Sequence, residues 1–213
     1  MNKEILYDKP SIVMYNNIFT PEECRDIIDS VPLCEFDSAT GFNTKTSQGE
    51  VTPHRTNSTY IDKPFRLAMI QQRLTKVIEN ELEGNSVYKK GCIETPLQVQ
   101  RYAYHQQYKP HIDFFNGPGH PKYFDVDRIA SAIVYLNDDF IGGETYFTAL
   151  NVEVKPKTGS VLFFRYDYDE LLDNMNTFHA GMPVSEGAKY IVTTFIRSEP
   201  LSYKWNALEK PKE

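Results

Sequence analysis

The second half of the chain consists of short runs of β-branched and aromatic residues separated by turn residues, and this pattern constrains the fold most. The runs span residues 97–104, 129–136, 144–147, 152–154, 160–164 and 189–196. The turn sequences between them are Gly117-Pro118-Gly119, Gly142-Gly143, Pro156-Lys157-Thr158-Gly159 and Glu186-Gly187. Several short strands at close spacing are typical of a sandwich or barrel. The pattern therefore predicts an antiparallel β core, and a jelly roll is the natural candidate.

Two helices are predicted before this core. Thr20, Pro21 and Glu23 form a helix start, in which Thr20 caps, Pro21 takes the first helical position and Glu23 completes a capping box. An apolar stripe at helical spacing follows, and Pro32 ends the helix. A second apolar stripe predicts a helix from about residue 64 to residue 82.

The 213 residues are expected to form one domain of the α+β class, with a core of antiparallel strands and supporting N-terminal helices. Residues 1–94 are expected to supply the helical support. They include a polar segment, 35–58, that is rich in Thr, Ser, Asn and Gly and predicts a long loop. Residues 95–200 are expected to form the β core, and residues 201–213 a C-terminal tail.

Composition excludes several classes of function. A net charge of −6 without a Lys/Arg block makes nucleic acid or an anionic membrane surface an unfavourable partner. No apolar run approaches the ~20 residues that span a bilayer, and the first residues lack the apolar stretch of a signal peptide. The three cysteines contain no C-x-x-C pair, which disfavours a disulfide framework and a thiolate zinc site. We therefore expect a cytoplasmic protein.

Two histidines and one aspartate are candidate metal ligands. His111 and Asp113 stand two residues apart, so on an extended segment both side chains project to the same side. A surface histidine beside a solvated aspartate would give the same pair. His179, at the mouth of the last predicted strand, adds a second imidazole. Two histidines and one carboxylate form the facial triad that holds Fe(II) and leaves positions open for a co-substrate and O2.

Lys189 opens the last predicted strand and is followed by Tyr-Ile-Val-Thr-Thr-Phe-Ile. A lysine directed into such an apolar neighbourhood is costly unless it meets an anion. An exposed lysine at the end of a strand is the alternative interpretation.

The order of these residues resembles the prolyl 4-hydroxylase branch of the Fe(II)/2-oxoglutarate-dependent dioxygenases. The matching motifs are Tyr102-x5-Tyr108-x-Pro110-His111-x-Asp113, Arg128, Tyr135-Leu136-Asn137, Gly142-Gly143-Glu144-Thr145, Pro156-x2-Gly159, His179-Ala180-Gly181-x-Pro183-Val184, Gly187-x-Lys189 and Ile196-Arg197. Weaker matches lie upstream, at Phe19-Thr20-x2-Glu23-Cys24 and Arg55-Thr56-x-Ser58. The dense part of the resemblance covers residues 95–197.

The resemblance implies a double-stranded β-helix fold and an enzyme that uses Fe(II), 2-oxoglutarate and O2, with ascorbate re-reducing the iron. It implies that His111, Asp113 and His179 bind the iron. Lys189 would pair with the distal carboxylate of 2-oxoglutarate, with Tyr102 and Thr145 as hydroxyl donors. In the family reaction, decarboxylation of 2-oxoglutarate to succinate and CO2 is coupled to hydroxylation of a C–H bond.

The implied substrate is a proline-containing peptide or protein, hydroxylated at C4 of a peptidyl proline. In relatives, positions equivalent to Arg55, Tyr108, Arg128 and Arg197 contact or line the peptide site. Two alternatives stay open from the residues alone: Arg55 as a solvated loop residue, and Arg128 as a charge on a strand edge. His105 stands where the family usually has glycine and Phe195 where it usually has tryptophan, so these two departures bear on the substrate.

Three other functions remain compatible with the sequence. The same chemistry on another residue, a free amino acid or a small molecule is the nearest. A nucleic-acid demethylase would share the triad but usually carries arginines after the second histidine, where this chain has Lys189. A non-catalytic binding module would have no need of the complete triad and the lysine.

Overall fold

A computed structural model describes residues 2–33, 36–43, 48–51, 53–61, 67–86, 88–89, 92–94, 96–114 and 128–199. Three features named above lie outside the described residues: the helix start at residue 64, the turn Gly117-Pro118-Gly119 and the tail 201–213. One of the three cysteines, Cys34, also lies outside them.

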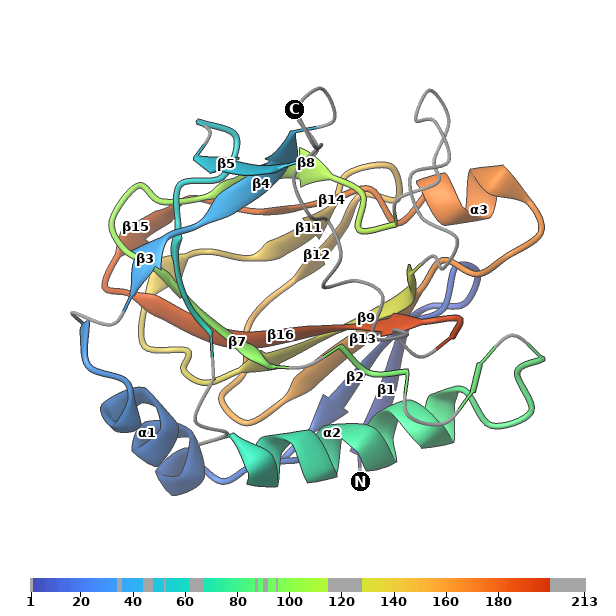
Figure 1. The fold of residues 1–213 in the computed structure, drawn as a ribbon, viewed down its shortest axis with the longest axis horizontal. Helices are drawn as coiled ribbons and strands as arrows, with labels where there is room; N and C mark the ends of the chain where they lie inside the picture. The colour runs from blue at the N-terminus through green and yellow to red at the C-terminus, as the bar shows by residue number, and fades with distance from the viewer. Residues whose placement is uncertain are drawn as a thin grey trace, which may run out of the picture.

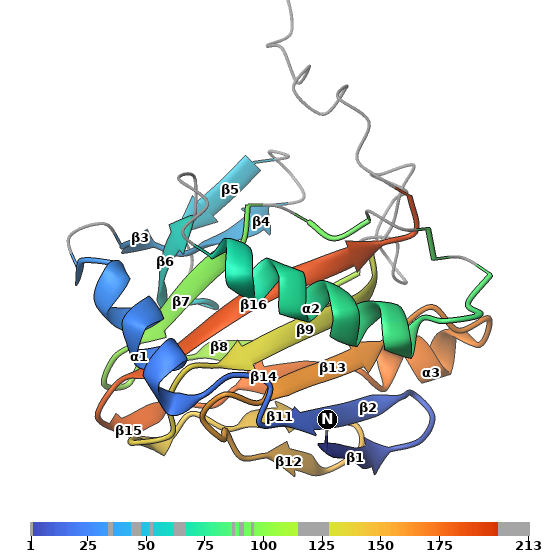
Figure 2. The same cartoon turned by 90° about the horizontal axis from the view of Figure 1, so that it is seen from below.

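The larger of two stacked sheets contains eight strands, all paired antiparallel (Figures 1 and 2). In spatial order they are β1 (Asn2–Tyr7), β2 (Ile12–Asn16), β13 (Val161–Arg165), β9 (Arg128–Tyr135), β16 (Lys189–Arg197), β7 (Gln98–Tyr102), β6 (Ser58–Ile61) and β3 (Asp37–Ser38). Strands from opposite ends of the chain meet here, because β2 of the first hairpin pairs with β13.

The smaller sheet has four strands, in the order β12 (Val152–Val154), β11 (Thr145–Phe147), β14 (His179–Gly181) and β8 (Tyr108–His111). Two further pairs flank it: β10 (Ile141–Gly142) with β15 (Val184–Glu186), and β4 (Thr40–Asn43) with β5 (Gln48–Val51). Figure 1 shows the smaller sheet facing the larger one, as in a jelly roll.

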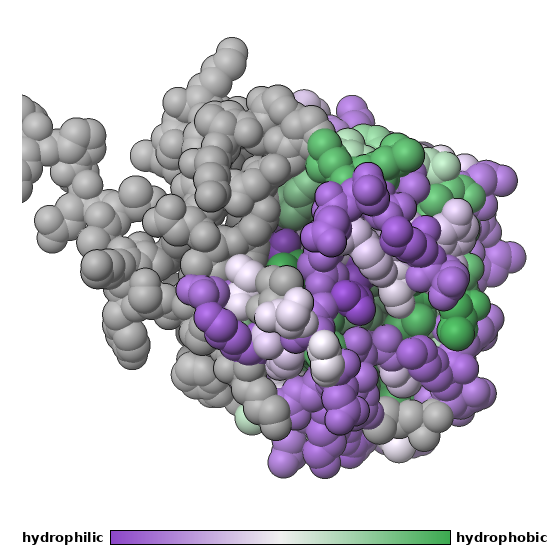
Figure 3. Space-filling model, turned by 90° about the vertical axis from the view of Figure 1, so that its right-hand side faces the viewer, coloured by the Kyte–Doolittle hydropathy of each residue, from purple (hydrophilic) through white to green (hydrophobic). Residues whose placement is uncertain are grey.

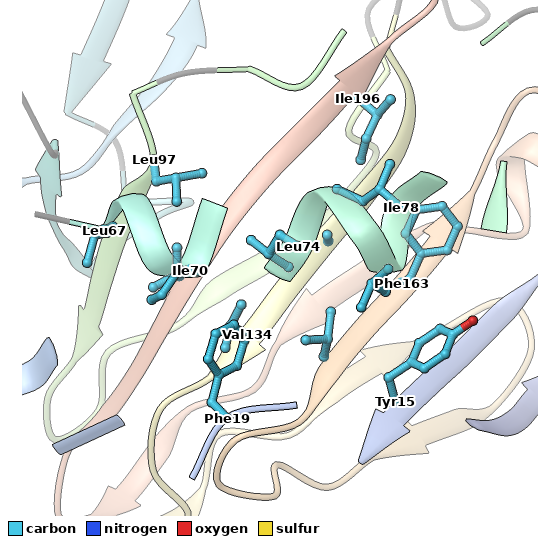
Figure 4. Close-up of a cluster of buried hydrophobic side chains, with 14 of the residues drawn as sticks. Tyr15, Phe19, Leu67, Ile70, Leu74, Ile78, Leu97, Val134, Phe163 and Ile196 are labelled. Carbon is cyan, nitrogen blue, oxygen red and sulfur yellow. The ribbon is translucent and has the colours of Figure 1, made fainter. Parts of the chain in front are cut away.

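Three helices complete the described structure: α1 (Pro21–Ser30), α2 (Ala68–Glu81) and α3 (Leu171–Met175). The capping box predicted for α1 is confirmed, because Thr20 accepts from the backbone of Glu23 and the Glu23 carboxylate accepts from the backbone of Thr20. Figure 2 shows α2 lying across the outer face of the large sheet. In Figure 4 its residues Ile70, Leu74 and Ile78 pack beside Val134 and Phe163 of that sheet.

The inner strands of the large sheet are buried on both faces, and their residues alternate between two cores. In β13, Val161 and Phe163 pack in the core under α1 and α2, whereas Leu162 and Phe164 pack in the core between the sheets. The strand β2 alternates in the same way. Because side chains of a strand point to opposite faces in turn, a strand buried on both faces reads as an unbroken apolar run.

The predicted α+β fold, an antiparallel β core with helices supporting it, is confirmed, and each of the six predicted runs contains a strand. The prediction of a loop over 35–58 is wrong for the described residues, which contain β3, β4, β5 and the start of β6. Strands β1 and β2 were not expected either. Polar, glycine-containing segments form these strands of the 35–58 region because partner strands supply the backbone hydrogen bonds that composition does not reveal.

Figure 3 shows the side of the molecule on which α3 lies in Figure 1. Hydrophilic residues cover much of the described part of this face, and hydrophobic residues gather near its top. The helix α3 contributes two exposed leucines, Leu171 and Leu172. No helix in the described ranges has the length and apolar character needed to span a bilayer.

Candidate metal and 2-oxo acid site

Two histidines face each other across the smaller sheet. His111 ends β8, His179 begins β14, and the two are register partners in the antiparallel pair. Their ring centroids lie 4.4 Å apart. Asp113 follows β8 by two residues, and its carboxylate reaches both imidazoles: Oδ1 lies 3.5 Å from Nε2 of His111 and Oδ2 lies 3.7 Å from Nε2 of His179. Backbone pairing therefore brings together the three residues that the sequence singled out.

Both imidazoles turn Nε2 toward the Asp113 carboxylate and Nδ1 toward a backbone carbonyl. The Nδ1 atom of His111 lies 2.8 Å from the carbonyl of Lys109, and that of His179 lies 2.9 Å from the carbonyl of Thr177. A carbonyl only accepts, so Nδ1 of each ring carries a proton, and Nε2 is the nitrogen left to bind a metal. Burial, together with the neighbouring His111, lowers the pKa of His179 to about 4, so this imidazole is neutral at pH 7.

The carboxylate of Asp113 is held in its ionised form. Burial alone would raise its pKa, but His179, His111 and a hydrogen bond from the Ser131 hydroxyl outweigh burial and lower it. The Ser131 Oγ lies 2.6 Å from Oδ2 of Asp113. An ionised, oriented carboxylate is what a metal ligand requires.

This donor set fits a divalent metal. One ligand atom each from His111, Asp113 and His179 lies within 4.8 Å of the others. Two imidazoles and one carboxylate, with no thiolate among them, match the triad that holds Fe(II) and leaves coordination positions open. The three residues could therefore hold Fe(II), with Nε2 as the donor of each histidine.

Lys189 supplies a positive charge at the same site. Only 2% of its surface is exposed, and its Nζ donates to the carbonyl of Gly143 at 2.6 Å. The Nζ also lies over the rings of Tyr102 and Tyr135, at 5.3 Å and 5.6 Å from their centroids. Within the described ranges no carboxylate forms an ion pair with it. Burial lowers its pKa to about 7, although the nearby Glu144 acts in the opposite direction. Its charge in turn contributes to lowering the pKa of His179.

Hydroxyl groups from both sheets surround this ammonium. The Tyr135 hydroxyl and Thr145 Oγ1 lie 2.8 Å apart and link β9 of the large sheet to β11 of the small one. Whichever of the two donates, the other keeps its own hydrogen for an anion. The hydroxyl of Tyr102, a cross-strand partner of Lys189, donates to Gln100 Oε1 at 2.9 Å. The cation and the spare hydrogen of the Tyr135–Thr145 pair suit a carboxylate, whereas Tyr102 would first have to release Gln100.

Arg55 and Tyr108 lie beside the candidate metal ligands. Backbone hydrogen bonds join residues 54 and 56 to residues 109 and 107, so Arg55 is held opposite Tyr108. The Arg55 guanidinium lies 4.8 Å from the centroid of the Tyr108 ring, and that ring stacks on His111 with centroids 3.5 Å apart. The structure thus aligns a guanidinium, a phenol ring and an imidazole ligand in one stack.

Arg128 and Arg197 are cross-strand partners at the ends of β9 and β16, and both engage Glu94. Arg128 donates to both carboxylate oxygens of Glu94, at 2.9 Å and 3.0 Å, and donates to the carbonyl of Asp113 at 3.3 Å. The Nε of Arg197 forms an ion pair with Glu94 at 2.7 Å. Its guanidinium is more deeply buried than that of Arg128, with side-chain exposures of 5% and 17%.

Sequence reasoning missed the residues that support these groups: Glu94, Gln100, Ser131 and Tyr135. Glu94, Ser131 and Tyr135 act through partners at least ten residues away in the chain, and Gln100 joins Tyr102 to Thr193 of the neighbouring strand. Spacing alone does not reveal such pairs. One signal was available, since Ser131 interrupts the apolar strand IASAIVYL and a buried hydroxyl needs a partner.

Comparison with known proteins places the chain in a family. The protein-family model of the 2OG-Fe(II) oxygenase superfamily matches residues 97–197. A putative prolyl 4-hydroxylase of Acanthamoeba polyphaga mimivirus is 30% identical over 216 residues, which cover 92% of this chain and 77% of that protein. The chain belongs to the prolyl 4-hydroxylase-like 2OG-Fe(II) oxygenases. Prolyl 4-hydroxylase 1 of Arabidopsis thaliana is 27% identical over 218 residues, with 93% of this chain and 73% of that protein covered.

Solved structures of other members of this family have the same fold. The viral collagen prolyl hydroxylase of Paramecium Bursaria Chlorella virus-1 in its 2OG complex superposes with a TM-score of 0.63 at 24% identity, covering 87% of this chain and 95% of that one. A Trichoplax adhaerens prolyl hydroxylase, in complex with a hypoxia inducible factor peptide fragment, gives a TM-score of 0.63 at 18% identity, covering 94% and 87%. The predicted double-stranded β-helix is therefore confirmed.

Proposed function

We propose that this protein hydroxylates C4 of a peptidyl proline, using Fe(II) and O2 and converting 2-oxoglutarate to succinate and CO2. One observation supports the proposal: the side chains of His111, Asp113 and His179 lie close enough together to hold one metal ion, and the buried Lys189, which forms no ion pair with a carboxylate of the described residues, lies nearby. A member of the family with this donor set has what is needed to bind iron and a 2-oxo dicarboxylate together. Bound Fe(II) supplies the oxidising chemistry, and the chain supplies orientation and charge.

The roles of the site residues follow from their contacts. His111, Asp113 and His179 are the proposed iron ligands. Lys189 is the proposed partner of the distal carboxylate of 2-oxoglutarate, assisted by Thr145 and Tyr102, and Tyr135 joins them through its bond to Thr145. A buried ammonium gains most from an anion, because both are removed from water and a charge-assisted bond replaces the lost hydration.

Four residues are the proposed contacts for the substrate. Arg55 and Tyr108 lie over the His111 side of the site, where guanidinium and hydroxyl donors suit the carbonyl groups of an extended peptide. Arg128 is proposed to line the site next to Asp113. Arg197 is proposed to contribute mainly through Glu94, because its own side chain is the more buried of the two arginines that Glu94 binds.

Spectroscopy tests the iron and 2-oxoglutarate part of this proposal. Anaerobic protein with Fe(II) and 2-oxoglutarate is expected to show a weak charge-transfer band near ~500 nm, which decays when oxygen is admitted. The His179→Ala variant should show no band. The Lys189→Ala variant should keep its metal and require far more 2-oxoglutarate. A folded wild-type protein that gives no band would contradict the proposal.

Peptide turnover tests the acceptor. Proline-containing peptides are expected to gain one oxygen atom and to release 4-hydroxyproline on hydrolysis, in step with succinate. Succinate formation that no such peptide stimulates would instead favour another residue, a free amino acid or a small molecule. Ascorbate is proposed to sustain turnover, which repeated cycles with and without it would measure. The cytoplasmic location expected from the sequence stays a prediction.

A further inference from the structure

A pair of hydroxyl groups lies behind Asp113 in the core between the two sheets. Ser131 sits in the middle of β9, between Ala130 and Ala132, and only 2% of it is exposed. Its partners on the neighbouring strands are Phe164 and Phe195. A hydroxyl in such apolar surroundings is costly unless it is hydrogen-bonded. A serine placed here therefore needs specific partners.

Ser131 has two such partners, and chemistry fixes the direction of both bonds. Its Oγ lies 2.6 Å from Oδ2 of Asp113 and 3.0 Å from the hydroxyl of Tyr166. An ionised carboxylate only accepts, so the single hydrogen of Ser131 points to Asp113. The bond between Ser131 and Tyr166 must then be donated by Tyr166. The result is a directed chain from Tyr166 to Ser131 to Asp113.

The far end of this chain is rigidly held. Tyr166 directly follows β13, and its backbone donates to the carbonyl of Ile129 at 2.9 Å. Its ring packs against Phe114 and Phe164, with centroids 5.5 Å and 6.1 Å away. Burial raises the pKa of its hydroxyl well above the usual value of 10, so it remains a donor. These contacts hold the Tyr166 hydroxyl oxygen beside Ser131.

We propose that Tyr166 and Ser131 are positioning residues for the metal ligand Asp113, and this inference rests on the proposed function. Without them the carboxylate could rotate about its last bond, because its other contacts are the two imidazoles that would face the metal. The bond from Ser131 fixes Oδ2 and stabilises the charged form, leaving Oδ1 as the oxygen without a hydroxyl donor. Partners of this kind orient metal ligands and strengthen binding.

Calorimetric titration of the intact protein with Mn(II) tests this chain of hydrogen bonds. Ser131→Ala is expected to weaken Mn(II) binding by about 10- to 100-fold. Tyr166→Phe, which removes one oxygen atom only, is expected to weaken it by a smaller factor. The controls are Ser160→Ala and Tyr15→Phe, which remove buried hydroxyls bonded to Lys157 and Glu81 instead, and which should leave Mn(II) affinity unchanged.

The double variant gives the deciding readout. Because the hydrogen bonds from Tyr166 reach Asp113 through Ser131, Tyr166→Phe should have little further effect on Mn(II) affinity in the Ser131→Ala background. If the effects of the two substitutions on the free energy of Mn(II) binding were fully additive, the proposed chain of hydrogen bonds would be wrong. So would unchanged Mn(II) affinity in a Ser131→Ala variant whose metal-free melting temperature falls no more than that of Ser160→Ala. Failure of the wild-type protein to bind Mn(II) or Fe(II) would remove the proposed function as well, which distinguishes the two failures.

Discussion

At the scale of single residues, the charge state of Lys189 links the co-substrate site to pH. Burial holds its pKa near 7, far below the usual 10.5, so the free protein loses this proton as pH rises through neutrality. The unfolded chain still binds that proton up to about 10.5. Folding stability therefore rises with pH between about 7 and 10.5 as far as this group decides it.

Affinity for 2-oxoglutarate should show the opposite trend. Below pH 7 the ammonium is already charged, whereas above pH 7 a bound carboxylate must draw a proton back onto it. We expect affinity for 2-oxoglutarate in the Mn(II) protein to fall by up to about tenfold per pH unit above 7. Calorimetry in buffers of different ionisation enthalpy should record the proton taken up. In Lys189→Arg the guanidinium stays charged, so this pH trend should vanish; a trend that survives there would exclude Lys189 as its source.

Glu94 is a second residue whose loss should strongly lower stability, because its carboxylate offsets the repulsion between two neighbouring arginines. Arg128 and Arg197 are direct cross-strand partners, and Glu94 binds both. Glu94→Ala would leave two largely buried guanidinium groups without their shared anion, at an expected cost of about 3–5 kcal/mol in the free energy of unfolding. Denaturant titration measures this. Glu153→Ala, at an exposed position of β12, should change stability by less than about 0.5 kcal/mol.

The proposed metal ligands and Lys189 could be singled out from the sequence, because few residue types do the proposed chemistry and these residues stand at or near strand ends. Glu94, Ser131 and Tyr135 could not. Glutamate, serine and tyrosine have many uses, and their partners here lie at least ten residues away, as in the bond from Tyr135 to Thr145. Only the pairing of strands brings such partners together.

At the scale of elements, α1 shows how local sequence decides a structure. Its capping box satisfies backbone donors at the helix start, and Glu23 also binds Arg73 of α2 with both carboxylate oxygens, at 2.6 Å and 2.7 Å. Thr20→Ala is expected to lower the free energy of unfolding by about 1 kcal/mol, since it removes the cap. Thr20→Ser keeps a hydroxyl and should be nearly neutral, as denaturant titration would show. An equal loss in both variants would mean that the Thr20 methyl, not the cap, stabilises α1.

The strands β1 to β5 mark the limit of local prediction. The segment Ile12–Asn16 is apolar without alternation because both of its faces are buried, so it does not show the period of a half-exposed strand. The strands β3 to β5 are short and come from polar sequence. Their backbone groups are paired by other strands, which is a property of the tertiary fold.

At the scale of the whole molecule, the two hydrophobic cores support different parts of the structure. The core under α1 and α2 holds the helices on the sheet, and the core between the sheets backs the site. Leu74 is fully buried in the first core. Leu74→Ala should lower the free energy of unfolding by about 2–5 kcal/mol and leave Mn(II) affinity unchanged. Phe164, fully buried in the second, has its ring 4.9 Å from that of His179. Phe164→Ala should therefore lower both stability, by about 3–5 kcal/mol, and metal affinity.

Measuring melting temperature and Mn(II) affinity for both variants tests this division. If Leu74→Ala weakened Mn(II) binding as much as Phe164→Ala, the two cores would be coupled and not separate.

The register that makes His111 and His179 partners has a consequence for how the protein is handled and regulated. Main-chain hydrogen bonds between β8 and β14 hold the two proposed histidine ligands in place. We therefore expect the fold to form whether or not the ion is bound. Stripping the ion with a chelator should leave the circular dichroism spectrum intact and lower the melting temperature only by the mass-action contribution of the lost ligand. Fe(II) added back should restore activity without refolding, unlike in zinc fingers, which collapse when demetallated. Unfolding on chelation would contradict this. A cell could then switch such a protein off and on through iron supply alone, with no new synthesis.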